Sequence, residues 1–500
     1  MPSASISKFI VSILLSSFLA ACGAETVPDN TAPTILSTTP SSSFMSASTS
    51  GNITGVAINS KITVVFSEPV NSATINASTF KVGSASGYIA YDSATKTATF
   101  TPSSPLKKLT KYSVTITTGV KDVAGNALAA DYKWDFTTGP VMSAGGRHVL
   151  LLKSDGTVWA WGFNEKGQVG DGTTVDRTTP VAVAALSGTT FASVAGGGYH
   201  SLALKDDGTV MGWGNNGNGQ LGNGEHTFTP VTSPVSASGL TGITAIAGGE
   251  FHSLALKNDG TVWAWGANGR GQLGNGSTNE SSVAVKASGL SGIIAIAAAG
   301  ENSIALKSDG SVWTWGDNTY GQIGVSSGDL SSVPVQVTVL TGIIAVSSGY
   351  DHGLALKNDG TVLAWGRNDN DQLGFEYVSG QNFHSTPAQV ANLSGISSVA
   401  AGYWHTLSVK NNNTGWAWGN ISYGQLGSGH GSENGANVAT PVQVINLGTK
   451  TIAALAAGED YSLALCSDGA VFSWGNQEHG RLGLGGIVNF VKAPELVGTF

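Results

Sequence analysis

The dipeptide Trp-Gly recurs seven times in the C-terminal part of this chain, at intervals of 50 to 56 residues. Self-similarity at such a period indicates a repeat architecture, in which each unit buries its hydrophobic face only against its neighbours. The sequence therefore predicts a propeller or an array over residues 141–500. The seven tryptophans are Trp161, Trp213, Trp265, Trp315, Trp365, Trp418 and Trp474.

Each repeat holds four short strand-like stretches, which is the content of one propeller blade. In the third copy, Asp259-Gly260 separates the stretches 253–256 and 261–265, and this dipeptide favours a tight hairpin turn with positive φ. Five other copies have the same Asp-Gly turn, and the sixth has Asn412-Asn413, since asparagine also tolerates positive φ. We expect each Trp to pack between neighbouring sheets and the Gly after it to permit close backbone approach.

The chain ends predict how the ring closes. Residues 494–497 are equivalent to residues 334–337 of an inner copy, but no further repeat follows them. Val141–Ala144 opens the first copy without such a strand before it. We therefore expect the C-terminal strand to complete the first blade, which leaves no exposed strand edge.

Residues 1–22 have the features of an export signal. Lys8 precedes an apolar run of 12 residues over 9–20, which is too short to span a bilayer. The run ends in Leu19-Ala-Ala-Cys22-Gly23, which resembles the bacterial lipobox, and this resemblance implies cleavage before Cys22 and diacylation of its sulfur. Gly23 in place of Asp implies the outer membrane. The alternative is a signal peptide that carries a cysteine by coincidence.

Only one other cysteine exists, Cys466, so lipidation of Cys22 leaves no partner for a disulfide. We expect Cys466 to be a partly exposed free thiol. A short polar linker over 23–30 follows the signal segment.

Residues 31–140 predict an all-β sandwich, because strand-like runs alternate with turns. The runs are 61–66, 97–101, 112–116 and 132–136. The phrases at 66–70, 121–126 and 134–138 resemble the bacterial immunoglobulin-like domains of exported surface proteins, which implies a spacer. Asp122 and Asn126 suggest either a calcium site or a hairpin turn, and the turn is the favoured interpretation.

The repeat pattern resembles the regulator of chromosome condensation repeat family. The motifs are Gly-Gly-x-x-His, Leu-Ala-Leu, Asp-Gly, Trp-Gly and Gly-Gln-Leu-Gly, and they cover residues 141–500. The resemblance implies a seven-bladed β-propeller of about 50-residue repeats behind the immunoglobulin-like sandwich. The departures are local: Asn302 and Tyr461 occupy the histidine slot, Asp371 replaces a Gly and Arg481 replaces a Gln.

What the family does is transferred only in part. Nucleotide exchange on a small nuclear GTPase is not carried over, because an exported lipoprotein meets no such substrate. The family also includes secreted bacterial propellers that inhibit β-lactamases by docking one face on the enzyme. Both precedents use residues just before the repeat histidine and their neighbours. We therefore predict a partner-binding face at Tyr199, Phe251, Glu301, Tyr350, Asp351, Tyr403, Trp404 and Asp460, beside Arg147, Glu250 and Glu459.

The aromatic members of this set are expected to be exposed, because other copies hold charged residues at the same slot. Exposed aromatic side chains gathered on one face mark interaction sites. The alternative is that all these positions are ordinary turn residues. A second candidate surface is the loop 375–387, with Phe375, Tyr377 and Phe383.

The net charge and the absence of known metal-binding and phosphate-binding motifs limit the classes of partner. The net charge of −8 divides into +2 for residues 1–140 and −10 for the rest, so the larger part repels phosphate backbones and nucleic acid is excluded. No zinc-ligand spacing or phosphate-binding loop is present, and five histidines at one per repeat cannot converge on one metal. We predict a monomeric, non-enzymatic envelope module that binds an unknown protein without metal or cofactor. Polysaccharide binding, an envelope enzyme acting on polysaccharide through the channel, and a structural or adhesive protein are the alternatives.

Overall fold

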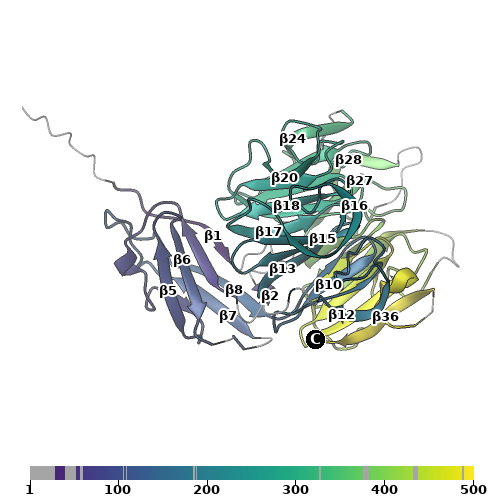
Figure 1. The fold of residues 1–500 in the computed structure, drawn as a ribbon, viewed down its shortest axis with the longest axis horizontal. Helices are drawn as coiled ribbons and strands as arrows, with labels where there is room; N and C mark the ends of the chain where they lie inside the picture. Colours follow the sequence, from purple (N-terminus) through teal and green to yellow (C-terminus); the bar gives the residue numbers. More distant parts are fainter. Residues whose placement is uncertain are drawn as a thin grey trace, which may run out of the picture.

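The computed structural model describes residues 29–39, 52–56, 60–104, 106–107, 110–183, 186, 189–325, 328–375, 382–431, 437–486 and 489–500. Figure 1 shows an N-terminal sandwich (purple to blue) beside a larger unit of repeated sheets (teal to yellow). Every sheet in both parts is four-stranded, and the fold is all-β as predicted. The signal segment and Cys22 lie outside the described residues.

The sandwich consists of two sheets that enclose one core. Its elements are β1 (Ile35–Thr39), β2 (Asn52–Val56), β3 (Ile62–Phe66), a 3-10 turn (Ser72–Thr74), β4 (Phe80–Val82), β5 (Gly87–Asp92), β6 (Thr97–Pro102), β7 (Lys111–Ile116) and β8 (Tyr132–Thr138). One sheet has the order β1-β3-β6-β5 and the other β2-β8-β7-β4. The four predicted strands correspond to β3, β6, β7 and β8, and their alternating apolar residues form the core.

Residues 141–500 form seven four-stranded sheets in chain order. Sheet 1 contains β9 (Val141–Ala144), β10 (His148–Leu152), β11 (Val158–Gly162) and β12 (Arg177–Ala182); sheet 2 contains β13 (Phe191–Gly196), β14 (His200–Lys205), β15 (Val210–Asn216) and β16 (Thr227–Ser236); sheet 3 contains β17 (Ile243–Gly248), β18 (His252–Lys257), β19 (Val262–Gly266) and β20 (Ser281–Lys286). Each sheet is a simple antiparallel meander.

The remaining sheets repeat this plan. Sheet 4 contains β21 (Ile293–Ala299), β22 (Asn302–Lys307), β23 (Val312–Asp317) and β24 (Leu330–Gln336); sheet 5 contains β25 (Ile343–Ser348), β26 (His352–Lys357), β27 (Val362–Arg367) and β28 (Phe383–Gln389); sheet 6 contains β29 (Ile396–Ala401), β30 (His405–Lys410), β31 (Gly415–Gly419) and β32 (Val438–Gln443); sheet 7 contains β33 (Ile452–Ala457), β34 (Tyr461–Cys466), β35 (Ala470–Asn476), a 3-10 turn (Glu478–Gly480) and β36 (Phe490–Thr499).

The predicted role of the C-terminal strand is wrong. Residues 494–497 belong to β36, which pairs with β35 in sheet 7, while sheet 1 is completed by its own strands. The phase of the repeat explains the error: the strand at 330–336 ends a sheet rather than beginning the next one, because it pairs with the strand just before it in the chain. Sheets 7 and 1 instead join by packing, with Trp161 and Leu151 in one core cluster with Leu463.

One backbone carbonyl at each interface ties a sheet to the next. The Gln220 carbonyl of sheet 2 accepts hydrogen bonds from Trp265 Nε1 and Ser253 Oγ of sheet 3, each at 2.8 Å. His200 Nε2 of sheet 2 lies 2.8 Å from the same Ser253 Oγ. Because the hydroxyl donates its proton to the carbonyl, the histidine must donate from Nε2, which leaves Nδ1 unprotonated. This arrangement accounts for the Trp and the His of the repeat, whereas the side chain of Gln220 accepts a hydrogen bond from the Asn218 backbone N–H at 3.0 Å.

Five interfaces carry the histidine–hydroxyl contact, with Nε2–Oγ distances of 2.8 to 3.1 Å. The pairs are His148–Ser201, His200–Ser253, His252–Ser303, His352–Thr406 and His405–Ser462. At the other two interfaces both partners change together. Asn302 replaces the histidine of sheet 4, and the neighbouring sheet 5 has Gly353 in place of the hydroxyl residue. Tyr461 replaces the histidine of sheet 7, and the neighbouring sheet 1 has Val149 in place of the hydroxyl residue. Tyr461 instead donates from its hydroxyl to the His148 carbonyl at 2.6 Å.

The Gly after each Trp is required by close backbone approach, as predicted. At Gly266 φ is +103°, and a Cβ there would lie 2.5 Å from the Phe251 carbonyl oxygen. The turn at Asn412-Asn413 also has the predicted geometry, with φ of 64° at Asn413.

The sandwich rests on one face of the repeated sheets. In sheet 3 the Asp-Gly turn lies at the 257 end of β18, whereas His252 lies at the opposite end. Ser37 Oγ of the sandwich donates to the Asn258 carbonyl at 3.3 Å, so the sandwich contacts the face that carries the Asp-Gly turns, here called the Asp-Gly face. The opposite face carries the turns that precede the histidines, and we call it the histidine face.

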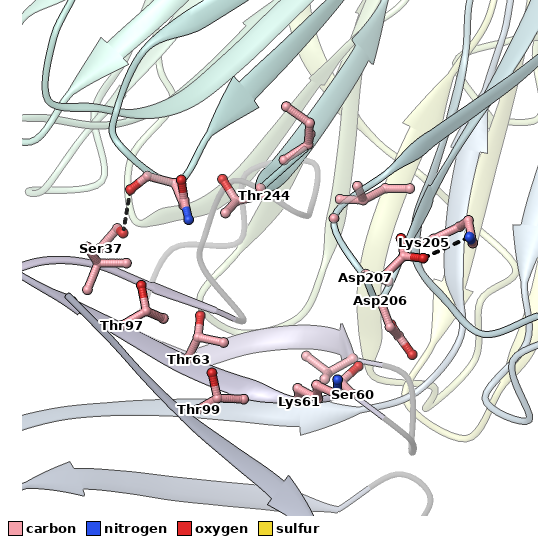
Figure 2. A pocket seen from close by; sticks show the side chains of 18 residues that line it. Ser37, Ser60, Lys61, Thr63, Thr97, Thr99, Lys205, Asp206, Asp207 and Thr244 are labelled. Carbon is pink, nitrogen blue, oxygen red and sulfur yellow. Dashed lines mark hydrogen bonds and ion pairs between the residues drawn. The ribbon is translucent and has the colours of Figure 1, made fainter. Parts of the chain in front are cut away.

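A cavity of about 370 Å³ separates the two parts on the Asp-Gly face. Figure 2 shows Thr63, Thr97 and Thr99 projecting from the sandwich toward Thr244 of β17 and Asp206 in the turn after β14. Burial raises the pKa of the Asp206 carboxyl, although the Thr190 hydroxyl and Lys61 oppose this. Within the part of the chain that the structure describes, no helix is long and apolar enough to cross a membrane.

The interface network yields a stability prediction. Ser253→Ala removes the hydroxyl that accepts from His200 and leaves a buried imidazole N–H without a partner. We expect the free energy of unfolding to fall by about 1–3 kcal/mol in urea denaturation. The control is Ser236→Ala on the exposed edge of sheet 2, which should change it by less than about 0.5 kcal/mol. Equal effects of the two variants would contradict the proposed network.

Candidate functional site

The predicted partner-binding residues gather on the histidine face. Each lies in the turn between the first and second strands of its sheet, next to a histidine slot. Six of the seven sheets meet around a central cavity of about 350 Å³. Its lining is Gly146, Arg147, Gly198, Tyr199, Glu250, Tyr350, Tyr403, Trp404 and Glu459. Four of the eight predicted residues therefore line one cavity: Tyr199, Tyr350, Tyr403 and Trp404.

The aromatic members contact one another instead of standing free. The Phe251 ring stacks on Tyr199 with ring centroids 6.0 Å apart, and Tyr350 lies 4.8 Å from Tyr403 and 5.5 Å from Trp404. All five are half-buried, so the expectation that Tyr199, Phe251 and Trp404 are exposed was wrong. The slot is partly covered whatever residue it holds, because Asp351 at the same position is also buried, with a relative exposure of 7%.

Two of the other predicted residues, Asp351 and Glu301, form ion pairs. Asp351 pairs with Arg367 at 3.1 Å, and Glu301 lies 3.6 Å from Arg270. The Arg367 guanidinium lies 4.9 Å from the Trp404 ring centroid and 4.6 Å from that of Tyr320. Arg270 and Tyr320 lie in the turns after the third strands of their sheets and Arg367 is the last residue of β27, and none of the three was predicted from the sequence. Their only signal was their position between Trp-Gly and the next Gly-Gln.

Two further carboxyls define the electrostatics of the mouth. Glu459 accepts hydrogen bonds from Arg147 Nε at 2.5 Å and from Arg147 Nη2 at 3.1 Å, so both its oxygens are occupied. Burial raises the pKa of Asp460 to about 6, and the neighbouring Glu459 charge adds to this, while Arg481 and Arg147 oppose it. Burial likewise raises the pKa of Asp351 to about 6, against the opposing Arg367.

Glu250 is the most deeply placed carboxyl of the cavity, with a relative exposure of 7%. It accepts a hydrogen bond from the Tyr403 hydroxyl, which comes from across the ring. Burial raises the pKa of Glu250 to about 7, although the Tyr403 hydrogen bond acts in the opposite direction. Gly198 makes room for this carboxyl, because a Cβ at that position would lie 2.5 Å from its carbon.

Comparison with known proteins identifies the larger part. Residues 135–430 match the RCC1-like domain, and residues 415–465 and 468–500 match the regulator of chromosome condensation (RCC1) repeat. The chain belongs to the RCC1-like domain family. Residues 29–138 match the bacterial Ig-like domain, so the resemblances to the repeat family and to the immunoglobulin-like domains are confirmed.

Several relatives share part or most of their length with this chain. The ultraviolet-B receptor UVR8 of Arabidopsis thaliana is 33% identical over 381 residues, which is 74% of this chain and 85% of that protein. The E3 ubiquitin-protein ligase HERC2 of Homo sapiens is 30% identical over 76% of this chain but only 6% of that protein. The mitochondrial protein RUG3 of Arabidopsis thaliana matches over 34% of its length.

Solved structures agree with the fold. Yeast RCC1 (Prp20), crystallised with Kap60, has a TM-score of 0.61 at 22% identity, covering 68% of this chain and 83% of its own. Human WBSCR16 has a TM-score of 0.59 at 23% identity, covering 68% and 90%.

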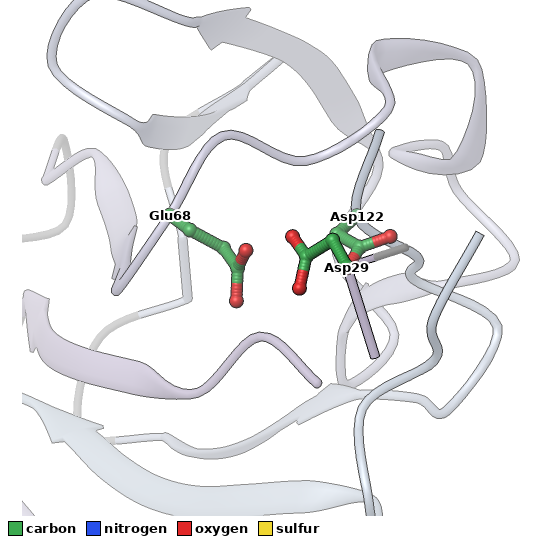
Figure 3. A group of neighbouring side chains, drawn as sticks. All are labelled: Asp29, Glu68 and Asp122. Carbon is green, nitrogen blue, oxygen red and sulfur yellow. The ribbon is translucent and has the colours of Figure 1, made fainter. Parts of the chain in front are cut away.

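Two other sequence expectations have a clear outcome. Asp122 and Asn126 form the favoured turn, in which Asp122 Oδ1 accepts from the Asn126 backbone N–H at 2.8 Å. The carboxylates of Asp29, Glu68 and Asp122 nevertheless lie within 4.8 Å of one another, as Figure 3 shows. Cys466 is fully buried rather than partly exposed, because the middle strands of each sheet are covered on both sides.

The alternative loop over 375–387 lies partly outside the described residues, including Tyr377. Phe375 is half-buried and packs against His384, and Phe383 is exposed.

The buried histidines predict an acid-sensitive fold. Burial lowers the pKa of each of the five repeat histidines from 6.5 to about 3. The unfolded chain therefore binds protons below about pH 6.5 that the folded chain rejects, and stability is lost as the pH falls. At about pH 5 each histidine lowers the free energy of unfolding by about 2 kcal/mol. The three carboxyls with raised pKa values, Glu250, Asp351 and Asp460, each increase it by roughly 1–3 kcal/mol. Five histidines outweigh three carboxyls.

We expect the midpoint of urea unfolding to fall between about pH 7.5 and about pH 5. The matched variant is His200→Asn with Ser253→Gly, which copies the natural Asn302–Gly353 interface. It removes one of the five buried histidines. The number of protons taken up on unfolding, which sets the slope of the free energy of unfolding against pH, should therefore fall by about one. An unchanged pH dependence in this variant would assign the acid sensitivity to other groups.

Proposed function

We propose that this chain is an exported lipoprotein whose seven sheets form a seven-bladed propeller, and that the propeller binds a protein partner through the histidine face. The observation that carries the proposal is the central cavity lined by Tyr199, Tyr350, Tyr403 and Trp404 beside carboxyl groups. Aromatic side chains in partly desolvated pockets are the anchors that dominate protein interfaces.

The relatives support a protein as the partner. Yeast RCC1 (Prp20) was crystallised with Kap60, and a second structure of Prp20p is described with its binding to Gsp1p and histones. These partners belong to those proteins. What carries over is the use of the propeller as a platform for proteins.

The arrangement of the two parts supports presentation outward. The sandwich occupies the Asp-Gly face through Ser37 and Asn258, so the histidine face points away from the N-terminal side of the chain. We propose that Cys22 is lipidated, that the sandwich is the spacer, and that the cell envelope, at the outer membrane or surface, is the location. We further propose a monomer.

An envelope enzyme acting on polysaccharide is the competing function. Glu250 and Glu459 line the same cavity, and a proton-holding carboxyl beside an ionised one is the pattern of glycosidases. Arg147 donates hydrogen bonds to both oxygens of Glu459, so the Glu459 carboxylate is hindered from acting as a base or nucleophile. The geometry therefore favours a non-enzymatic binding module over the hydrolase.

The binding face is tested by Phe251→Ala with Trp404→Ala. We expect capture of envelope proteins by the purified chain to weaken by roughly 2 kcal/mol or more, because both rings belong to the aromatic cluster. Binding is measured by affinity capture followed by quantitative titration of the captured protein.

The control is Tyr88→Ala, which removes a ring that is 75% exposed on the sandwich and should leave capture unchanged. The double variant should stay folded, because its rings are half-buried at a surface turn and outside the sheet cores. Undiminished capture by the folded double variant would move the interface elsewhere.

The anchor is tested by Cys22→Ser. Without the thiol no acyl chain is attached, so the variant should leave the membrane fraction for the soluble envelope fraction or remain unprocessed. Fractionation with a salt wash, followed by mass measurement of the N-terminus, distinguishes these outcomes. A processed variant that stays with the membrane contradicts lipidation.

A further inference from the structure

The central cavity of the histidine face is large enough to admit a partner's side chain. Its volume of about 350 Å³ lies within the range of small-molecule sites, roughly 300–1,000 Å³. Glycines at its rim keep it open: a Cβ at Gly146 would lie 2.8 Å from the Tyr403 hydroxyl.

The walls of the cavity suit a cation. Tyr199, Tyr350, Tyr403 and Trp404 supply aromatic faces, and aromatic faces attract ammonium and guanidinium groups. The protein already uses this chemistry at its rim, where the Arg367 guanidinium lies over Trp404 and Tyr320.

The floor of the cavity holds a carboxyl without a cationic partner. Among the described residues, Glu459, Glu301 and Asp351 each have an arginine within 4.0 Å, but Glu250 has no such ion pair. Arg147 is near, but its hydrogen bonds go to Glu459. A cation that enters the cavity and contacts this carboxylate offsets the free-energy cost of burying an unpaired charge.

We propose that the cavity receives a cationic side chain, lysine or arginine, from the protein partner, with Glu250 as its counter-ion and Tyr350, Tyr403 and Trp404 as its walls. This rests on the proposed function and specifies the chemistry of the partner. Charge complementarity supports it, because carboxyls outnumber guanidiniums around the mouth. The described carboxyls there include Glu250, Glu301, Asp317, Asp351, Asp369, Glu459, Asp460 and Glu478, and the guanidiniums include Arg147, Arg270, Arg367 and Arg481.

The test titrates the full chain with Nα-acetyl-lysine amide and Nα-acetyl-arginine amide, with Nα-acetyl-norleucine amide as the neutral probe, by ligand-observed NMR. Cationic probes should bind and the neutral probe should not. Whichever cation binds more tightly identifies the inserted residue. Equal binding of norleucine amide, or no binding of either cation, overturns the proposal.

The decisive variant is Glu250→Gln, which keeps an oxygen that accepts from Tyr403 but removes the charge. Affinity for the cationic probes should fall by roughly tenfold or more. Glu495→Gln, on the exposed outer strand of sheet 7, is the matched control and should change nothing. Equal affinities of wild type and Glu250→Gln overturn the proposal.

Protonation provides a second readout. The groups that face Glu250 are Tyr403, Glu459, Arg147, Glu301 and Tyr350. Probe affinity in the wild type should fall from about pH 8 to about pH 6, as Glu250 takes up a proton, and this fall should be absent in Glu250→Gln. The same pH dependence in both proteins overturns the assignment of the counter-ion.

Failure of this inference differs from failure of the proposed function. If Phe251→Ala with Trp404→Ala loses protein capture but the cationic probes do not bind the wild type, the binding face stands and the cation site is rejected. If capture survives the aromatic substitutions, the proposed function is rejected whatever the probes show.

Discussion

The fold depends on one backbone carbonyl at each interface between sheets, which accepts the indole N–H of the Trp in the next sheet. At six interfaces this carbonyl belongs to the repeat Gln, and where sheet 7 meets sheet 1 it belongs to Arg481, at the longer distance of 3.2 Å. At five interfaces the carbonyl also accepts a hydroxyl from the next sheet. A single sheet of four strands cannot bury both faces of its middle strands, so its stability depends on its neighbours. The Gln carbonyl fixes the neighbour's position through directional contacts at 2.7 to 2.9 Å, while the Trp fills the gap. The histidine completes the network by donating to the same hydroxyl.

This constraint separates residues that are fixed from residues that can vary. Trp, Gln, His and Ser are committed to the interfaces, whereas the residue before each histidine projects from a turn at the ring centre. Turns of six sheets converge on the central cavity, so the variable positions of distant repeats become neighbours. Glu250 of sheet 3 and Tyr403 of sheet 6 meet across the ring, although 153 residues separate them. The candidate site therefore consists of turn positions whose side chains are not needed for packing between the sheets.

The two interfaces without a histidine show how the network constrains substitution. Asn302 faces Gly353, and Tyr461 faces Val149, so the donor and its hydroxyl acceptor are lost together. A histidine opposite Gly353 would bury an N–H without an acceptor, which costs about 1–3 kcal/mol. The Tyr461 interface is also where sheet 7 meets sheet 1, and the Tyr461 hydroxyl donates directly to backbone carbonyls of sheet 1.

The sequence by itself determined the repeat, the all-β class, the turns at Asp-Gly, the Trp between sheets and the slots of the candidate site, because these follow from local periodicity and backbone geometry. It did not determine which strand ends each sheet, because a repeating pattern of four strands does not show where one sheet ends and the next begins. Nor did it determine that the aromatic rings contact one another or that Cys466 is covered on both sides. It also did not determine that Glu250 accepts a hydrogen bond from Tyr403 and has no ion pair among the described residues. These depend on distances between residues of different sheets. Only the tertiary structure sets those distances, because side chains far apart in sequence meet when the sheets pack.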